Sequence, residues 1–249
     1  MVCEGFSAGD SVVHRLDPRG RVLAAVAFSA VIAVTARFGA LGAGLAAAAA
    51  AALAARLPFV PVLKRLAALN AFMALLWVIL PLTSPGSETF PLGPLRLSTA
   101  GAALAAGITL KANAIVLMLT ALLGTIELTA LGHALSHLRV PDKLVHLFLL
   151  TVRYIDVLHH EYERLRHAMK VRCFRPALNG HTLRTFGYLV GMLLVKSLDR
   201  SERIIAAMKC RGFCGRFYVL HHFAFAGRDA AFGALSLVGL LALGWMAWG

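Results

Sequence analysis

Five segments of this chain are apolar enough, and nearly long enough, to cross a lipid bilayer as helices. They cover residues 22–36, 39–55, 66–82, 100–123 and 232–248. A spanning helix needs about 17–25 predominantly apolar residues. The first segment is slightly short, but the long side chains of Arg21 and Arg37 at its ends can reach the membrane interfaces. The pattern predicts an all-α polytopic membrane protein with about five transmembrane helices.

The composition supports this prediction and limits the possible partners. Hydrophobic residues make up 59% of the chain and charged residues only 15%, whereas about 25% of residues are charged in a soluble domain. The formal net charge is nevertheless +13. Lysine and arginine follow the hydropathy pattern and form no dense patch interleaved with aromatic residues, so we expect contact with membrane lipid and not with nucleic acid.

The cations also predict the orientation. The stretch 127–229, between the fourth and fifth segments, holds 16 of the 25 lysines and arginines. Further cations precede the first segment or lie between the second and third: Arg15, Arg19, Arg21, Arg56, Lys64 and Arg65. The two opposite loops carry only Arg37 and Arg96. Because cytoplasmic loops are enriched in lysine and arginine, we expect a multi-pass protein of a bacterial-type inner membrane with its N-terminus inside.

These patterns divide the chain into four parts. We expect a cytoplasmic N-terminal segment (1–21), a membrane domain of four spans (22–124), a cytoplasmic or interfacial helical coupling domain (125–229) and a last transmembrane helix (230–249). A sixth apolar run, 186–195, has only ten residues, and we interpret it as an interfacial or buried helix. The four cysteines show no paired framework, which favours a reducing cytosolic setting: they are Cys3, Cys173, Cys210 and Cys214.

The coupling domain contains an internal repeat. Residues 163–174 and 202–213 align without gaps at an offset of 39 and are identical at seven of twelve positions. Such self-similarity predicts two structurally equivalent elements, and each reads as the C-terminal end of a helix. Pro176 cannot continue the first helix, and Gly212 fits a cap of the second. In the second helix, Asp199 and Arg203 have the i,i+4 spacing of an ion pair.

Each repeat presents an arginine beside a small residue. Ala168 with Arg172, and Ala207 with Arg211, are four residues apart and share a helix face. The alanine lets another chain approach closely, while the guanidinium can reach carboxylates or helix-terminal carbonyls. A lone basic helix end could merely complement the helix dipole or touch lipid phosphates. Duplication of the whole string Ala-Met-Lys-x-Arg-x-Phe instead favours a partner with two equivalent sites, such as a dimer.

The repeats resemble the paired Ala-Arg-Gly motifs of the T component of energy-coupling-factor (ECF) transporters, most closely the cobalt-type CbiQ branch. The residues at 138–141 and 153–155 resemble the family's approach to its first coupling helix, and those at 16–19 resemble its opening motif. The specific similarity covers about 125–213 and that N-terminal fragment. The first repeat keeps only Arg172 of its motif, since Val171 and Cys173 flank it, and Cys210 replaces the alanine of the second.

The resemblance implies a transmembrane scaffold of an importer for cobalt (or nickel) ions. Its partners would be two ABC ATPases (CbiO-like), a substrate-binding membrane subunit (CbiM-like) and, in some assemblies, a CbiN-like small subunit. ATP and magnesium would bind to the ATPases, the metal substrate would bind to the substrate subunit, and this chain would hold no cofactor. The expected ATPase-coupling residues are Arg172, Arg211, Ala168, Ala207, Met169, Met208, Lys170, Lys209, Gly212, Glu163 and Glu202.

An amphipathic stripe before the first repeat is the expected contact with the substrate subunit. Its apolar residues recur at helical spacing and include Leu147, Phe148, Val152, Ile155 and Leu158. We expect this face to transmit movement of the two arginine-tipped helices to the substrate subunit.

A direct permease, or a metal-handling membrane protein acting without ATPases, is the alternative. Lys111 and Asn113 lie midway along the fourth segment, and an ionisable residue there is a functional hypothesis by default. A lysine repels cations, however, and no acidic residue lies within any predicted span. We therefore expect Lys111 to serve helix pairing in the assembly.

Metal binding and catalysis are not expected of this chain. His133 and His137 have a spacing that can place two ligands on one metal. Further candidates are the histidine doublets at 159–160 and 221–222 and the pair Cys210 and Cys214. None of these groups forms a complete set of metal ligands by its local spacing. The acidic residues Asp156, Glu161 and Glu163 lie on one predicted helix, where charge pairing with basic neighbours already accounts for them. Without a Gly-rich phosphate loop, ATP hydrolysis has to come from a partner, so we expect no catalytic residues.

Overall fold

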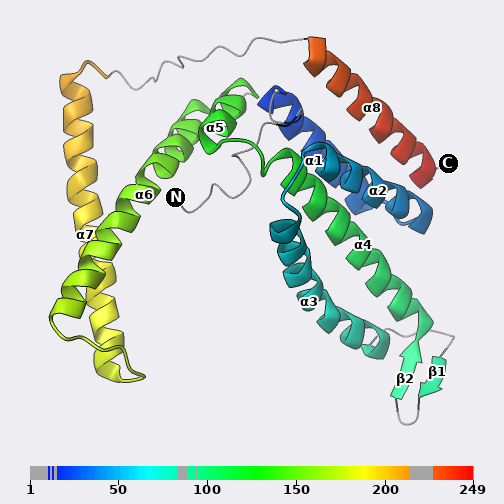
Figure 1. Ribbon diagram of the computed structural model, residues 1–249, viewed down its shortest axis with the longest axis horizontal. Coiled ribbons are helices and arrows are strands. Elements are labelled where there is room, and N and C mark those ends of the chain that lie inside the picture. Colours follow the sequence, from blue (N-terminus) through cyan, green and yellow to red (C-terminus); the bar gives the residue numbers. More distant parts are fainter. Residues whose placement is uncertain are drawn as a thin grey trace. The chain divides into compact units, whose positions relative to one another are not determined.

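The computed structural model describes residues 11, 13, 16–83, 89–92, 95–138, 140–213 and 227–248. Their regular secondary structure consists of helices and one short two-stranded hairpin (Figure 1). They form two compact units. The membrane unit comprises the described residues up to 127 together with 227–248, and the coupling unit comprises 128–213. The predicted fold class, a helical polytopic membrane protein, is confirmed.

The first two predicted spans are short helices. Helix α1 is Pro18–Val34 and α2 is Phe38–Ala54, each of 17 residues, or about 25 Å. The carboxylate of Asp17 caps α1 by accepting a hydrogen bond from the Arg19 amide at 2.9 Å, and Pro18 occupies the first turn. The length of α1 and α2 is at the lower limit for a helix that crosses a bilayer.

The other three predicted spans are longer. Helices α3 (Phe59–Thr83), α4 (Thr99–Leu122) and α8 (Gly227–Trp248) are long and apolar enough to cross a membrane. Helix α3 begins seven residues before the apolar segment predicted for it, so Lys64 and Arg65 lie within its first two turns. Their flexible side chains allow this because they can extend from a helix end to the interface.

A hairpin that the sequence did not predict connects α3 to α4. Strand β1 (Thr89–Leu92) pairs antiparallel with β2 (Leu95–Ser98), with Thr89 opposite Ser98. Ser98 then caps α4, because its hydroxyl accepts a hydrogen bond from the Gly101 amide at 3.4 Å.

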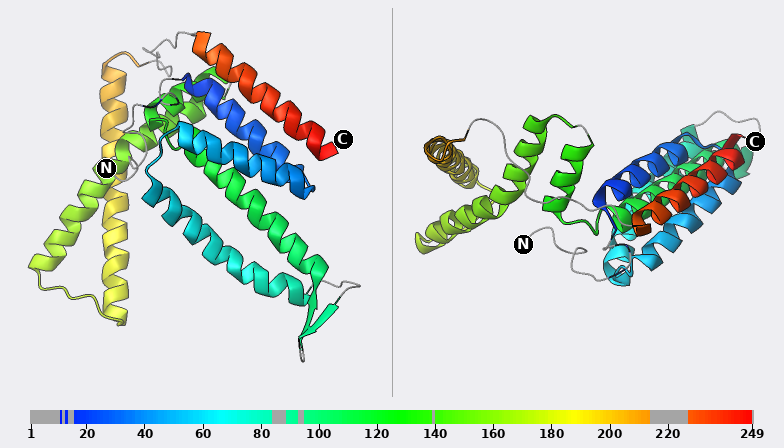
Figure 2. Two further views of the ribbon diagram at one scale, coloured as in Figure 1. Left: turned by 45° about the vertical axis from the view of Figure 1, so that its right-hand side comes forward. Right: turned by 90° about the horizontal axis from the view of Figure 1, so that it is seen from above.

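Helix α4 lies at the centre of the membrane unit and packs against α1, α2 and α3 (Figure 2). One core cluster joins α1, α2, α4 and α8 through Phe28, Ile32, Leu41, Leu117 and Leu243. Polar pairs add to this packing between α3 and α4. The side chains of Asn70 and Asn113 exchange hydrogen bonds of 2.8 and 3.3 Å, and Trp77 Nε1 donates to Thr109 Oγ1 at 3.1 Å.

The coupling unit consists of α5 (Leu128–His137), α6 (Asp142–Val171) and α7 (Gly180–Cys210). Helix α5 packs closely on α6 because Gly132 is buried against Leu149; a Cβ atom at position 132 would lie 2.4 Å from Leu149 Cδ2. The apolar run 186–195 lies within α7, where Leu189 is its one buried residue and Val190 is 62% exposed. Because α6 covers only one side of α7 among the described residues, most of this run is exposed within the chain, and its placement as an interfacial or buried helix stays a prediction.

Candidate functional site

Both repeats form the same backbone structure at the ends of α6 and α7. At the first end, the Phe174 amide donates to Met169 O at 3.1 Å and the Cys173 amide donates to Lys170 O at 3.0 Å. At the second end, the Phe213 amide donates to Met208 O and the Gly212 amide to Lys209 O, both at 3.0 Å. This hydrogen-bond pattern is a Schellman motif, in which a left-handed residue closes a helix. The repeat therefore specifies two equivalent helix ends.

The residue in the left-handed position differs between the two ends. Cys173 has φ +60° and Gly212 has φ +78°. Glycine adopts this conformation without a steric penalty, whereas a residue with a Cβ atom does not. The first helix end is therefore the more strained of the two.

The repeated side chains divide in the same way at both ends. The methionine and the phenylalanine, which occupy the apolar positions of the motif, are half-buried. The alanine, the lysine and the arginine are exposed. We call these two surfaces the arginine tips; they comprise Ala168, Lys170, Arg172, Ala207, Lys209 and Arg211.

The first arginine tip borders a hollow of about 550 Å³ between the end of α6 and the start of α7. Its lining combines Arg172 and Arg175 with His181 and Thr185 of α7. The ring of Phe174 lies edge-on to Phe186, with 6.1 Å between centroids, and closes the turn between the helices. A basic hollow of this kind suits an acidic or carbonyl-rich surface.

Helix α7 separates the two arginine tips. The first tip lies beside the N-terminal turn of α7, across the hollow, and Arg211 is the C-cap of α7. The 31 residues of α7 correspond to roughly 45 Å at 1.5 Å per residue. A single continuous helix thus holds the two tips at a fixed spacing.

An ion pair joins α6 to α7 between the two tips. Lys196 Nζ of α7 donates a hydrogen bond to Glu161 Oε1 of α6, and Arg164 Nη1 lies 3.6 Å from Glu161 Oε2. The bond from Lys196 lowers the pKa of the Glu161 carboxyl, although burial opposes the shift. Sequence reasoning assigned Glu161 only to charge pairing within α6. The pairing with Lys196 depends on how the helices cross, which no local spacing reveals.

The acidic residues of the repeats play smaller roles. Glu163 lies 3.5 Å from Arg166 and 3.7 Å from His167, and Glu202 is exposed. The predicted ion pair of Asp199 with Arg203 is wrong: Arg203 Nε donates to the backbone carbonyl of Asp199 at 3.2 Å. Because its guanidinium bonds to the carbonyl of the preceding turn, the spacing alone does not guarantee a carboxylate contact.

The predicted substrate-subunit face of α6 divides into two parts. Phe148 and Val152 are half-buried, and Phe148 lies beside Gly132 of α5. Leu147 is 61% exposed, and Ile155 and Leu158 are also exposed. With Leu144, these exposed residues follow one helix face that the described part of the chain leaves uncovered.

The structure also shows where the residues considered for a permease or a metal site lie. Lys111 Nζ donates to the Ala33 carbonyl near the end of α1 at 2.9 Å, so this lysine pairs helices within the chain itself. Among the described residues, no group of three His, Cys, Asp or Glu side chains is placed to hold a metal ion. Cys214, His221 and His222 lie outside the described residues, as do Cys3, Arg15 and Arg139.

Comparison with known proteins identifies the family. Residues 9–219 match the family model CbiQ, described as a cobalt transport protein. The chain is 26% identical to the energy-coupling factor transporter transmembrane protein EcfT of Listeria innocua, over 86% of this chain and 85% of that protein. It is 29% identical to the cobalt transport protein CbiQ of Rhodobacter capsulatus, over 52% of this chain and 53% of that protein.

An uncharacterized protein of Methanocaldococcus jannaschii is also similar, at 29% identity over 39% of this chain and 35% of that protein. Because the family model covers most of the sequence, the chain belongs to the CbiQ family. This family comprises membrane components of transporters and is not a class of enzymes. The resemblance stated from the repeats and the opening motif is confirmed.

Proposed function

We propose that this chain is the energy-coupling component of an ECF-type importer for cobalt or nickel ions. In this role it links two cytoplasmic ATPases to a substrate-binding membrane subunit. The observation that carries the proposal is the pair of equivalent arginine tips at opposite ends of α7. The names of the EcfT and CbiQ relatives supply the transporter class and the cobalt substrate.

The arginine tips suit a partner with two-fold symmetry. A dimer presents the same site twice, and two copies of one helix end can enter both sites in the same way. Each tip offers a planar guanidinium for carboxylates or carbonyls beside an alanine that permits close approach. The coupling residues of this proposal are those of the two repeats, with Arg172 and Arg211 as the central contacts.

The continuous α7 limits how such a device can move. Its length fixes the spacing of the tips, so closure of an ATPase pair would tilt or rotate α7 against α6. The exposed face of α6, with Leu147, Ile155 and Leu158, would carry that movement to the substrate subunit. ATP and magnesium would bind to the ATPases, and the chain would lie in the inner membrane with its N-terminus in the cytoplasm.

Charge reversal at both arginine tips tests the docking role. We expect R172E/R211E to abolish co-purification of the ATPases, because each new carboxylate would face the acidic or carbonyl surface that held a guanidinium. The control is K143E/R184E, which makes the same charge change at exposed positions of α6 and α7 outside the tips. Unchanged ATPase recovery with R172E/R211E would contradict the proposal.

Metal titration separates the scaffold from a direct permease. We expect the purified full-length chain to bind neither Co²⁺ nor Ni²⁺ stoichiometrically in calorimetry. Cells should take up cobalt only when the ATPases and the substrate subunit are produced together with this chain. Cobalt uptake supported by this chain alone would favour the permease.

A further inference from the structure

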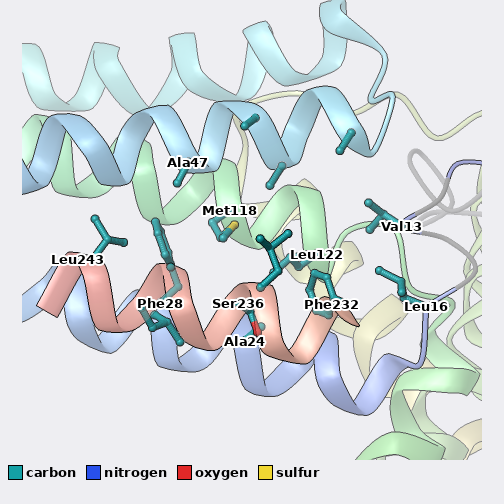
Figure 3. A pocket seen from close by; sticks show the side chains of 16 residues that line it. Val13, Leu16, Ala24, Phe28, Ala47, Met118, Leu122, Phe232, Ser236 and Leu243 are labelled. Carbon is teal, nitrogen blue, oxygen red and sulfur yellow. The ribbon is translucent and has the colours of Figure 1, made fainter. Parts of the chain in front are cut away.

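An apolar groove of about 540 Å³ lies in the membrane unit between α1, α2, α4 and α8 (Figure 3). It extends along α8 from Phe232 to Leu243, a rise of about 16 Å. Ser236 is the one polar side chain among its described lining residues. The groove is therefore long, apolar and parallel to the helices that form it.

The alanine run of α2 explains why this space is not filled. Helix α2 faces the groove with Ala47, Ala50, Ala51 and Ala54, which recur at i, i+3, i+4 and i+7 on one helix face. The methyl groups at these positions leave a space beside α8 that larger side chains would fill. Leu235 on the rim is 73% exposed, so the groove opens to one side.

Positive charge collects where α1 and α8 begin, beyond one end of the groove. Arg21 lies on the same face of α1 as the lining residues Ala24 and Phe28, about one turn before Ala24 toward the N-terminus. It is 1% exposed, and its Nη2 donates to the Leu122 carbonyl at 2.6 Å and to Thr125 Oγ1. Among the described residues, its Nε atom has no hydrogen-bond partner and no carboxylate forms an ion pair with it.

With Arg21 counted, the described residues at the starts of α1 and α8 carry one net positive charge. The Asp17 amide donates to Asp229 Oδ1 at 2.8 Å, which places the starts of α1 and α8 side by side. Three arginines (Arg19, Arg21 and Arg228) and two aspartates (Asp17 and Asp229) lie at these helix starts, and Arg19 forms an ion pair with Asp17. The N-termini of α1 and α8 add the positive ends of two helix dipoles. A buried guanidinium without a carboxylate partner is costly unless an anion lies nearby.

We propose that this groove binds one phospholipid, with an acyl chain along α8 and an anionic headgroup against Arg19 and Arg228, the two arginines at this end that are not fully buried. The volume lies within the range of about 300–1,000 Å³ typical of ligand pockets. Water does not suit the groove, since a bound water needs two to four polar partners and the lining offers one hydroxyl. An acyl chain matches the apolar lining and its direction, and a phosphate matches the positive end.

The test measures lipid retained by the full-length chain purified in mild detergent. Native mass spectrometry and analysis of extracted lipid should give about one phospholipid per chain. A47L and A50L, which fill the groove from α2, should each reduce that lipid at least tenfold. A46L is the matched control, because Ala46 is an exposed neighbour that does not line the groove.

A second measurement tests the headgroup. In nanodiscs containing equal phosphatidylglycerol and phosphatidylcholine, the wild type should retain mainly phosphatidylglycerol, and R19Q/R228Q should lose that preference. Absence of bound lipid, or equal retention in A47L and A46L, would overturn the proposal. So would an A47L chain that keeps its lipid but loses a membrane subunit, because the occupant would then be a protein. None of these outcomes depends on ATPase docking.

Discussion

The ammonium of Lys196 on α7 donates a hydrogen bond to the carboxylate of Glu161 on α6, and Glu161 is only 8% exposed. Eleven residues separate Glu161 from Arg172, and fifteen separate Lys196 from Arg211. Those distances are about 16 and 22 Å along the helices. A small change of the crossing angle at this pair would therefore be enlarged at the arginine tips.

Neutralising the pair should weaken the contact between α6 and α7. The pKa of Glu161 is lowered below its ordinary value of 4.5 by the bond from Lys196. The stabilisation is thus fully present above about pH 4.5 and is lost as the pH falls through the lowered value. We expect E161Q to remove this acid dependence, as measured by hydrogen exchange of α6 and α7 amides from about pH 6 down to about pH 3, through the range in which the carboxylate is protonated.

The reversed pair E161K/K196E is the control for this prediction. It restores opposite charges at the crossing, so it should recover more protection than either single charge reversal. Equal protection in the double and single variants would show that the two side chains are not coupled.

The native cysteines allow the spacing of the arginine tips to be measured directly. Cys173 and Cys210 are exposed and free, and each lies next to a tip arginine. With Cys3 and Cys214 replaced by serine, spin labels at these positions should report a distance of roughly 45 Å, set by the length of α7. E161Q should broaden the distance distribution. A main distance under about 30 Å would mean that α7 does not separate the tips.

The apolar runs of the sequence predicted the membrane helices well, because a chain in lipid has to form all its backbone hydrogen bonds internally. A backbone in hydrocarbon has to satisfy its own hydrogen bonds, so an apolar run of sufficient length becomes a helix. The bounds of the five predicted segments differ from those of the helices by five residues at most, except at the start of α3. The sequence did not predict that α3 begins at Phe59, because Lys64 and Arg65 interrupt the apolar run without breaking the helix.

The sequence located the repeats but not the contacts between helices. The string from Met169 to Phe174 carries the Schellman motif locally, so its duplication was visible. The Glu161–Lys196 pair and the bond from Arg21 to Leu122 join residues 35 and 101 positions apart. Such contacts follow from helix crossing, which side-chain periodicity does not define.

Exchanging the left-handed residues of the two helix ends should produce effects of opposite sign. C173G should stabilise the end of α6 by about 1 kcal/mol, because glycine removes the steric cost of a positive φ. G212A should destabilise the end of α7 by a similar amount. Hydrogen exchange of the Phe174 and Phe213 amides, which close the two motifs, measures both changes. Identical effects in both variants would contradict the prediction.

Lys111 should contribute to stability and not to ion passage. Its ammonium donates to the Ala33 carbonyl, so K111M should lower the unfolding free energy by about 1–2 kcal/mol. Cobalt uptake by the assembled transporter should remain at the wild-type level when expression is matched. A loss of uptake in a correctly assembled K111M complex would instead place Lys111 on a transport path.

Arg21 should be the most sensitive position of the described N-terminal residues. Its guanidinium bonds to the Leu122 carbonyl at the end of α4 and to Thr125, six and three residues before α5 begins at Leu128. R21A would leave both acceptors without their donor, and hydrogen bonds to a charged group contribute about 1.5–3 kcal/mol each. We expect R21A to destabilise the chain by about 3 kcal/mol and R21K by less, because lysine keeps the charge but not the forked donors. Thermal unfolding in lipid-free detergent measures this, with the half-buried Arg19 changed to alanine as the control. Equal melting temperatures of R21A and R19A would show that the buried bonds of Arg21 do not hold α1 to α4.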